Sequence, residues 1–318
     1  MKRVYVTGGN GFLGHSVVKG LAAAWDEVDL VVSADLRDPA PEHEIEGVIY
    51  AKADVTDAQV VSDQILDNGI DTVVHLASIV NPGKATTVEQ EYAVDVDGSR
   101  NVFEACVRHG VKRVVVSSSG AAYGYHADNP AWLSETDPVR GTDTFPYSLH
   151  KRLVEEMLAE YRESAPQLEQ VILRIGTILG ESVDNQITDL FRKKRLLKIR
   201  GSDSPFVFIW DQDVVGVILQ AVLGEKTGIY NVAGDGAMSV DQIAKEMGKG
   251  VLPVPVSALK AGLGVANRLG MSPHGPDQTD FLEYRPVLDN TRLKEEFGYT
   301  PKHTSREAFK AWQESQGL

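Results

Sequence analysis

The sequence contains a single cysteine, Cys106, among its 318 residues. One thiol excludes an intramolecular disulfide and a metal site built from several thiolates. Histidine and carboxylate clusters at metal-ligand spacing are also missing, so we expect no metal site. The predicted role of Cys106 is packing within a helix.

Long apolar runs are absent as well. No stretch approaches the roughly 20 apolar residues that a membrane span needs, and no signal-type apolar segment precedes the first strand-like run. Basic residues are too few to balance the acidic ones, since 32 Lys and Arg stand against 45 Asp and Glu, a net charge of −13. That excess argues against sequence-independent nucleic-acid binding, which requires a basic surface. We expect a cytoplasmic protein that acts on a small-molecule substrate, with neither nucleic acid nor membrane as a partner.

Short β-branched runs alternate with helix-like segments through the first half of the chain. The runs are "KRVYVTG", "DLVVSAD", "GVIYAKAD", "DTVVHLAS", "KRVVVSSS" and "EQVILRIG". Strands that alternate with helices predict right-handed βαβ units and a parallel sheet covered on both faces. The expected fold is α/β, a Rossmann-type doubly wound parallel sheet with a smaller mixed C-terminal substrate lobe.

The rhythm changes after about residue 176, where glycines, prolines and the segment "VLPVPV" interrupt the pattern. We expect the dinucleotide-binding domain to comprise residues 1–175 and about 206–234. The substrate lobe then comprises about 176–205 and 235–318.

Two local features are also predicted. Thr56 precedes an amphipathic stretch that reaches Asn68 and is expected to cap that helix. The basic stretch 192–200 is interpreted as a solvated helix face, with contact to an anionic substrate as the alternative.

A glycine-rich loop, Gly8 to Gly14, follows the first strand-like run and precedes a helix-like segment. The spacing T-G-x-x-G-x-x-G from Thr7 gives a tight turn whose backbone N–H groups can approach a pyrophosphate, which a Cβ would obstruct. Asp35 ends the second run, where a carboxylate accepts hydrogen bonds from the adenosine ribose. This context predicts an NAD or FAD site. Asp35 favours NAD over NADP because it repels a 2′-phosphate, a repulsion that Arg37 partly offsets.

Tyr147 and Lys151 stand four residues apart in a predicted helix, so their side chains lie on one face. A neighbouring cation favours the phenolate, which would let Tyr147 act as an acid or base near neutral pH. Ser117, Ser118 and Ser119 end a strand at the carboxyl edge of the sheet, where ligands bind. One of these serines is expected to orient the reacting oxygen.

These motifs resemble those of the extended short-chain dehydrogenases/reductases of the NAD-dependent epimerase/dehydratase family, which includes UDP-glucose 4-epimerases, over nearly the whole chain. The glycine loop, "ADVTD", "HLAS", "SSSGAAYG" and "YSLHK" occur in the family's order, with Asn101 in its helix-four position. The resemblance implies that Ser119, Tyr147 and Lys151 are catalytic. It also implies a set of NAD-binding residues: Gly8, Gly11, Phe12, Leu13, Gly14, Asp35, Asp54, Val55, Leu76, Ala77, Ser78, Tyr147 and Lys151.

The family pattern fails around the substrate. Gly120-Ala121 replaces the Asp-Glu of the family's dehydratases, so we expect no dehydration. Thr177 stands where epimerases often carry the asparagine of R-x-x-N, and Phe206 or a close neighbour stands where they carry an arginine. Arg285, in a segment that resembles the family's Arg-Pro, would keep one phosphate contact. The expected substrate residues are Ser119, Ala121, Thr177 and Arg285.

Hydride transfer at a secondary alcohol or ketone carbon is the expected reaction, and a sugar-nucleotide 4-epimerase is the leading hypothesis. An NAD(P)-dependent dehydrogenase or reductase on a non-nucleotide alcohol or ketone is the alternative, and a non-catalytic dinucleotide sensor is the second alternative. The resemblance further implies a homodimer through a four-helix bundle formed by helices near 88–109 and 148–163. Tyr123, His75 and His150 are expected to be structural.

Overall fold

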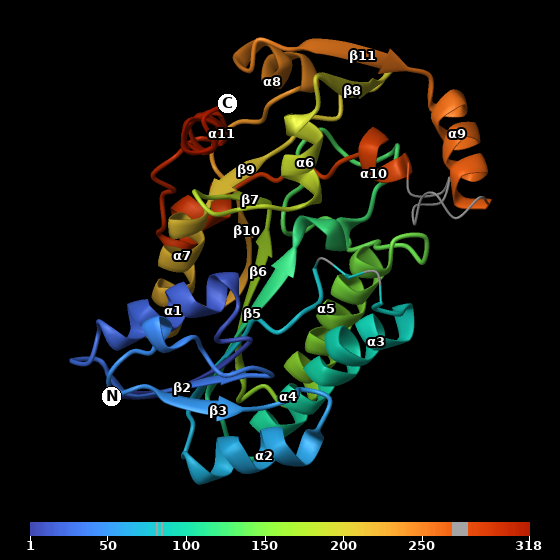
Figure 1. Ribbon diagram of the computed structural model, residues 1–318. Coiled ribbons are helices and arrows are strands. Elements are labelled where there is room, and N and C mark those ends of the chain that lie inside the picture. The colour runs from blue at the N-terminus through green and yellow to red at the C-terminus, as the bar shows by residue number, and fades with distance from the viewer. Residues whose placement is uncertain (81, 84, 269–278) are drawn as a thin grey trace.

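The computed structural model describes residues 1–80, 82–83, 85–268 and 279–318, which form a larger and a smaller lobe (Figure 1). The larger lobe contains a seven-stranded sheet of order β10-β6-β5-β4-β1-β2-β3, in which each neighbouring pair is parallel. Its strands are β1 (Lys2–Thr7), β2 (Val28–Asp35), β3 (Ile49–Lys52), β4 (Thr72–His75), β5 (Arg113–Ser119), β6 (Glu169–Ile175) and β10 (Gly228–Val232). The order reverses between β1 and β4, the switch point at which such sheets bind ligands. The predicted doubly wound fold is confirmed.

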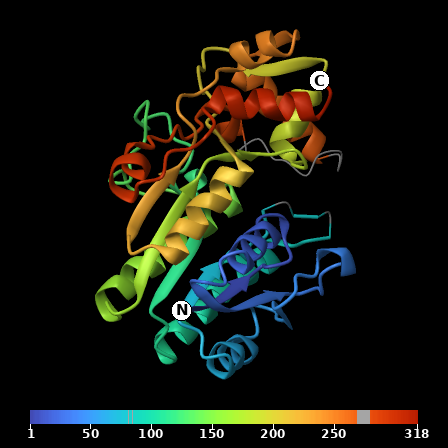
Figure 2. The same cartoon turned by 90° about the vertical axis from the view of Figure 1, so that its left-hand side faces the viewer.

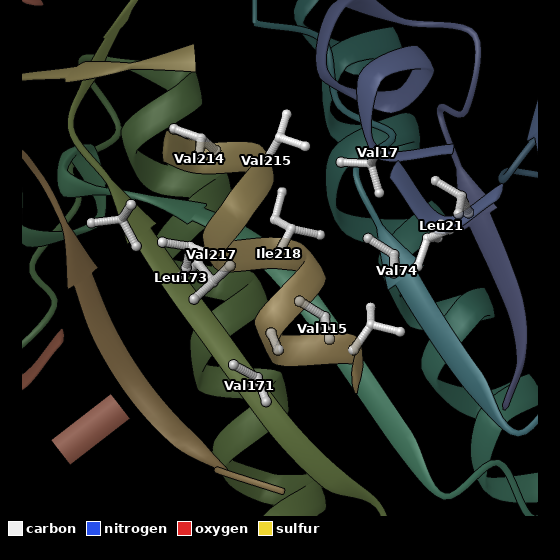
Figure 3. Close-up of a cluster of buried hydrophobic side chains, with 14 of the residues drawn as sticks. Val17, Leu21, Val74, Val115, Val171, Leu173, Val214, Val215, Val217 and Ile218 are labelled. Atoms are coloured by element: carbon white, nitrogen blue, oxygen red, sulfur yellow. The ribbon is translucent and has the colours of Figure 1, made fainter. Parts of the chain in front are cut away.

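Helices cover both faces of this sheet. On one face α1 (Phe12–Ala22) and α7 (Asp211–Leu223) enclose a core of Val and Leu side chains, including Val17 and Val217 (Figure 3). On the other face lie α2 (Ala58–Asp67), α4 (Gly98–Arg108) and α5 (Pro146–Ser164). Val4 and Val6 of β1 belong to the first core and Tyr5 to the second, as alternation along a strand requires. Cys106 is buried in the second core, which confirms its predicted packing role.

The start of α2 differs from the prediction. Asp57, rather than Thr56, caps the helix, and its carboxylate accepts two backbone N–H bonds of 3.1 Å each. Thr56 instead donates its N–H and its hydroxyl to Asp54, at 2.9 and 2.7 Å. Both side chains suit a helix cap, and the turn made by Asp54 delays the helix by one residue. The helix ends beside Asn68, as expected.

Two short parallel sheets, separate from the large one, lie in and beside the smaller lobe. One pairs β8 (Arg195–Ile199) with β11 (Gly250–Val254), and the other pairs β7 (Thr177–Leu179) with β9 (Phe208–Trp210). The helices of this part are α6 (Gln186–Arg192), α8 (Val240–Glu246), α9 (Val256–Arg268), α10 (Asp280–Glu283) and α11 (Ser305–Ser315). The segment η5 (Leu293–Phe297) returns to the core beneath α7.

The basic stretch 192–200 does not form one helix face, so that prediction was wrong. The helix α6 ends at Arg192, and β8 begins at Arg195 because backbone pairing with the distant β11 overrides the local preference. No helix within the described ranges is long and apolar enough to cross a membrane. The carboxyl ends of β5 and β6 point toward the smaller lobe, and the view turned by 90° shows the smaller lobe beyond the same edge (Figures 1 and 2).

Candidate active site

The glycine loop joins β1 to α1 at the switch point of the sheet. Gly8 has a φ of +66°, a backbone conformation that favours glycine. A Cβ at Gly14 would lie 2.0 Å from the Gly8 carbonyl oxygen, so the helix can approach the loop only with glycine there. The first N–H groups of α1 follow Gly11 and have no side-chain cap. Free donors at the positive end of a helix dipole fit a pyrophosphate.

Two carboxylates, Asp35 and Asp54, lie at or just after the carboxyl ends of β2 and β3. Asp35 accepts N–H bonds from Asn10 at 3.1 Å and from Arg37 at 3.3 Å, which hold it at the end of β2. Asp54 is fixed by its two bonds from Thr56. These positions fit ribose and adenine groups of a dinucleotide.

Val55 lies next to Asp54 and connects this side to α4. Its carbonyl accepts the amide N–H of Asn101 at 2.9 Å, and its side chain lies so close to Gly98 that a Cβ there would come within 2.6 Å of it. Asn101, expected in the family's helix-four position, therefore ties α4 to the segment after β3.

The chain after β4 carries Leu76, Ala77 and Ser78. The backbone N–H groups of Leu76 and Ala77 lie 3.2 and 3.3 Å from the Thr7 hydroxyl oxygen, which ties this segment to β1. The Ser78 hydroxyl is buried without a hydrogen-bond partner among the described residues. A buried hydroxyl is costly to leave unpaired, so this position fits a polar group of a bound cofactor.

His75, at the end of β4, is structural as predicted. Its Nδ1 lies 2.8 Å from the Thr7 hydroxyl, and its Nε2 lies 2.9 Å from the Ser99 hydroxyl. Ser99 donates its proton to the Asp95 carbonyl, so His75 must carry a proton on Nε2. Burial, assisted by the charge of Lys151, lowers the pKa of His75 to about 3. The ring is therefore neutral.

A π-helical turn, η2 (Ala93–Asp97), joins α3 (Val88–Tyr92) to α4. Such turns are frequent at functional sites because they redirect a side chain. Here the turn buries Asp95, whose carboxylate accepts the Ile79 N–H at 2.8 Å and pairs with His150 Nδ1 at 3.0 Å. Asp95 thus connects the segment that carries Ser78 to the helix α5. His150 is structural, as predicted.

Tyr147 and Lys151 occupy one face at the start of α5, which begins with Pro146. The Lys151 Nζ lies 5.5 Å from the centroid of the Tyr147 ring and donates to the Ser117 carbonyl at 2.9 Å. Lys151 is buried, whereas Tyr147 is half-buried and its phenol has no hydrogen-bond partner in the part of the chain that the structure describes. The phenol is free to meet a substrate.

Ser119 ends β5 beside this face. Its Oγ accepts the Ala121 N–H at 3.1 Å, and its proton has no acceptor within the described ranges. The Ser148 hydroxyl donates to the Ala121 carbonyl at 2.6 Å, which holds the segment after Ser119 against the helix of Tyr147. The structure therefore brings Ser119, Tyr147 and Lys151 to one edge of the sheet.

A buried polar network supports this edge, and sequence reasoning missed it. Glu155 accepts the Ser118 hydroxyl at 2.5 Å and pairs with Arg174 at 2.7 Å. Although burial acts against it, the bonds from Glu155 hold the pKa of Arg174 above its ordinary value. Arg174 also donates to the Tyr123 hydroxyl at 2.8 Å. A carboxylate four residues after Lys151, on the same helix face, was the available signal.

Tyr123 is fully buried within this network, so the prediction that it is a packing residue is confirmed. Burial raises the pKa of Tyr123 to about 12, against the effect of Arg174. The same contacts keep Arg174 away from any substrate.

Of the expected substrate residues, Ser119 and Ala121 lie together at the end of β5, whereas Thr177 and Arg285 belong to other elements. Ala121 is buried in η3 (Gly120–Tyr123), and Thr177 is half-buried at the start of β7. Arg285 follows α10 in the smaller lobe, where its backbone N–H and its Nη1 bond to Ser204. Its guanidinium carbon lies 3.9 Å from the centroid of the Phe206 ring.

A hollow of about 690 Å³ opens beside the glycine loop. Asn10, Gly11 and Phe12 line one side of it, and Glu181 and Trp210 lie among the residues of the other. The N-terminus of α1 therefore has open space in front of it.

The doubly wound sheet, the uncapped helix behind a glycine loop and the Tyr147–Lys151 face define a class, the dinucleotide-binding enzymes of the short-chain dehydrogenase/reductase type. Residues 4–233 match the model of the NAD dependent epimerase/dehydratase family. The chain belongs to this family, which confirms the resemblance, the expectation of an enzyme and the choice of NAD.

Individual relatives agree with the family. An uncharacterized protein of Mycobacterium tuberculosis is 26% identical over 325 residues, which cover 100% of this chain and 85% of that protein. A UDP-glucose 4-epimerase of Neisseria meningitidis serogroup C is 29% identical over 187 residues, which cover 57% of this chain and 54% of the epimerase. The structure of the Thermus thermophilus UDP-glucose 4-epimerase in complex with NAD has 26% identity and a TM-score of 0.72, with 99% of both chains covered.

Proposed function

We propose that the protein is a sugar-nucleotide 4-epimerase, with Ser119, Tyr147 and Lys151 as its catalytic residues. The observation that carries the proposal is the free Tyr147 phenol beside the buried Lys151, at the same sheet edge as a loop that fits a pyrophosphate. The similarity to UDP-glucose 4-epimerases of two bacteria supports the substrate class.

The chain's own groups divide the chemistry between them. Tyr147 accepts the proton of the substrate hydroxyl and later returns it, while Ser119 donates its unused proton to the same oxygen. Lys151, held by the Ser117 carbonyl, keeps a positive charge beside the phenolate. When bound, NAD supplies the hydride acceptor and donor for the reacting carbon.

The cofactor is held by residues of the larger lobe. The N–H groups of Phe12 and Leu13 face the pyrophosphate, while Gly11, whose N–H is held by the Gly8 carbonyl, leaves room for it. Asp35 accepts hydrogen bonds from the adenosine ribose hydroxyls. Ser78 and Lys151 hold the nicotinamide ribose. Residues 1–175 with about 206–234 form this cofactor domain, and about 176–205 with 235–318 form the substrate lobe, of which 269–278 lie outside the described residues.

The proposal also covers the oligomeric state of the protein and its cellular compartment. The protein works in the cytoplasm as a homodimer that packs α3 and α4 against α5 of a second copy. Exposed residues of opposite charge, such as Arg100, Glu104 and Glu156, would pair across this bundle. Light scattering tests the dimer, and a monomer at high concentration contradicts it.

A dehydrogenase or reductase that acts on a non-nucleotide alcohol is the second candidate, and one observation favours it. The Arg174 guanidinium is paired with Glu155, and Phe206 or a close neighbour stands where the family's epimerases carry an arginine. Of these three positions only Arg285 offers a cation to a diphosphate, which needs donors or cations.

The test is to incubate the purified protein with UDP-galactose, without added cofactor, and follow the anomeric proton by NMR. We expect conversion, and Tyr147→Phe should slow it by about 10²- to 10⁴-fold while leaving NAD bound. Tyr92→Phe, at an exposed tyrosine on α3, is the matched control and should convert at the normal rate. Bound NAD without conversion would move the assignment to the second candidate.

A further inference from the structure

Asn10, in the middle of the glycine loop, uses its whole amide group to hold the end of β2 and the segment after it. Its side-chain N–H donates to the Arg37 carbonyl at 2.7 Å, and its side-chain oxygen accepts the Ser33 hydroxyl at 2.9 Å. A carbonyl oxygen can only accept, so the amide must present its nitrogen to Arg37 and its oxygen to Ser33. The backbone N–H of Asn10 donates to Asp35 Oδ2 at 3.1 Å. The loop is thereby fastened to the end of β2 at three points.

The chain before Asn10 lies directly on β2. The Gly9 N–H donates to the Ala34 carbonyl at 3.1 Å, and a Cβ at Gly9 would lie 2.3 Å from the hydroxyl oxygen of the buried Ser33. Only glycine lets the loop come so close to this strand, and the close approach brings the Asn10 side chain within reach of Arg37.

Arg37 closes this set of contacts on Asp35. The Arg37 N–H donates to Asp35 Oδ1 at 3.3 Å, so each carboxylate oxygen accepts one backbone N–H and keeps a further lone pair for another donor. Arg37 in turn has its N–H bound by Asp35 and its carbonyl bound by Asn10. We call Ser33, Asn10, Asp35 and Arg37 the Asn10 clasp. Removing the Asn10 amide leaves the Arg37 carbonyl without its partner and loosens the N–H that orients Asp35.

The Asn10 clasp decides what the Asp35 carboxylate can meet. Its free lone pairs accept the hydroxyl protons of a ribose, whereas a 2′-phosphate carries the same sign of charge and is repelled. A site that accepts this phosphate needs the carboxylate turned away and a cation in its place. Two exposed cations without an ion pair among the described residues lie beside Asp35, namely Arg37 in the chain and Lys52 at the paired position of β3. Of these two, only Arg37 has its backbone held by the clasp.

We propose that Asn10 is a specificity-determining residue for the cofactor. Its side-chain amide acts through the backbone of Arg37. It keeps the Asp35 carboxylate turned to the adenosine ribose, and it prevents the Arg37 segment from closing on a 2′-phosphate. NAD is therefore selected by the whole clasp, and Asp35 alone is not sufficient. The inference rests on the proposed function in assigning Asp35 to the ribose, and it is independent of the substrate.

The test compares two affinities in each protein. The purified protein is titrated with NADH and with NADPH, and the ratio of the two dissociation constants is taken from the nicotinamide fluorescence. NAD that copurifies competes equally with both and cancels in the ratio. We expect the parent to prefer NADH by about a hundredfold or more, and Asn10→Ala to lower this preference by about tenfold. A purely structural role would weaken both affinities by one factor, so an unchanged ratio in Asn10→Ala, or a parent without the preference, overturns the proposal.

Matched variants control for the loss of an amide. Asn68→Ala removes a side-chain amide that donates to the Gln64 carbonyl at 2.8 Å beside the end of α2, and it should leave the ratio unchanged. An equal drop in Asn68→Ala would show that the ratio follows a general loss of stability, which contradicts the proposal. Ser33→Ala removes the hydroxyl that holds the Asn10 oxygen and should lower the ratio by about two- to tenfold. It takes the place of Asn10→Ala if that variant does not fold, and an unchanged ratio is then the negative result.

Two further variants separate this inference from the cofactor assignment on which it rests. Asp35→Ala should lower the preference for NADH more than Asn10→Ala does. If Asp35→Ala leaves the ratio unchanged, the assignment of Asp35 to the ribose fails, and a drop in Asp35→Ala with none in Asn10→Ala rejects the clasp alone. The double variant Asn10→Ala/Arg37→Ala should recover part of the preference, because the cation that serves the 2′-phosphate is gone. No recovery would overturn the role of Arg37.

Discussion

Arg174 is buried among carboxylate and hydroxyl groups, whereas the half-buried Arg285 packs among aromatic rings. Around Arg174, the wall beneath Ser119 and Tyr147 is complete before any ligand arrives. Around Arg285, no carboxylate of the described residues lies within ion-pair distance of the guanidinium. The contrast indicates that the network around Arg174 is satisfied by the chain itself, whereas the described surroundings of Arg285 supply no counter-charge.

The largest expected effect on stability comes from replacing Arg174, and the replacement of Arg285 serves as the comparison. Arg174→Met leaves Glu155 buried and unpaired, so we expect the free energy of unfolding to fall by about 3–5 kcal/mol. Arg285→Met removes an uncompensated charge and should leave the stability unchanged or raised. Urea denaturation of the two variants in parallel measures both effects. Equal losses would remove the distinction between the two arginines.

Local features of the site were predictable from the sequence, and features assembled over long distances were not. The glycine loop and the Tyr147–Lys151 pair each lie within a few residues, so their spacing carried the information. A cluster of aromatic rings joins residues 125, 145 and 281, and no spacing in the sequence links them. The cap of α2 shows that some local features cannot be predicted either. Thr56 and Asp57 are adjacent and have similar capping ability, so which of them caps the helix depends on where the chain turns.

A smaller effect on stability is expected from pH, through the buried side chain of His75. His75 stays neutral in the fold down to a pKa of about 3, but in the unfolded chain it binds a proton below its ordinary value of 6.5. Stability from this group is therefore present above pH 6.5 and is lost as the pH falls toward 3. Between pH 7 and pH 5 the loss is about 2 kcal/mol. Denaturation at both pH values measures it.

The variant His75→Gln isolates this contribution, because glutamine cannot bind a proton in the unfolded state. Its stability should change less between pH 7 and pH 5 than that of the parent protein. His43→Gln, at an exposed histidine, is the control and should leave the pH dependence as it was. An identical pH dependence in His75→Gln would contradict the assignment of a neutral ring.

Asp95 provides the next smaller effect, at the junction between the cofactor segment and α5. Asp95→Asn replaces one carboxylate oxygen with a donor, which then faces either the Ile79 N–H or His150. We expect a loss of about 1–3 kcal/mol in stability, the cost of one unsatisfied buried group. NAD affinity should also fall because the Ser78 segment loses its anchor. Fluorescence titration with NADH measures that affinity, and an unchanged value would assign Asp95 to stability alone.

The smallest expected effect on stability concerns the N-termini of two helices, α2 and α1. The first turn of α2 is satisfied by Asp57, while that of α1 is left open behind Gly11. Asp57→Ala should lower the free energy of unfolding by about 1 kcal/mol, with or without NAD. Thr56→Ala, one residue away, should cost less because Thr56 does not cap the helix. If α1 is open because a pyrophosphate completes it, saturating NAD should stabilise the parent and Asp57→Ala by the same amount, since the ligand satisfies only the end that the chain leaves uncapped.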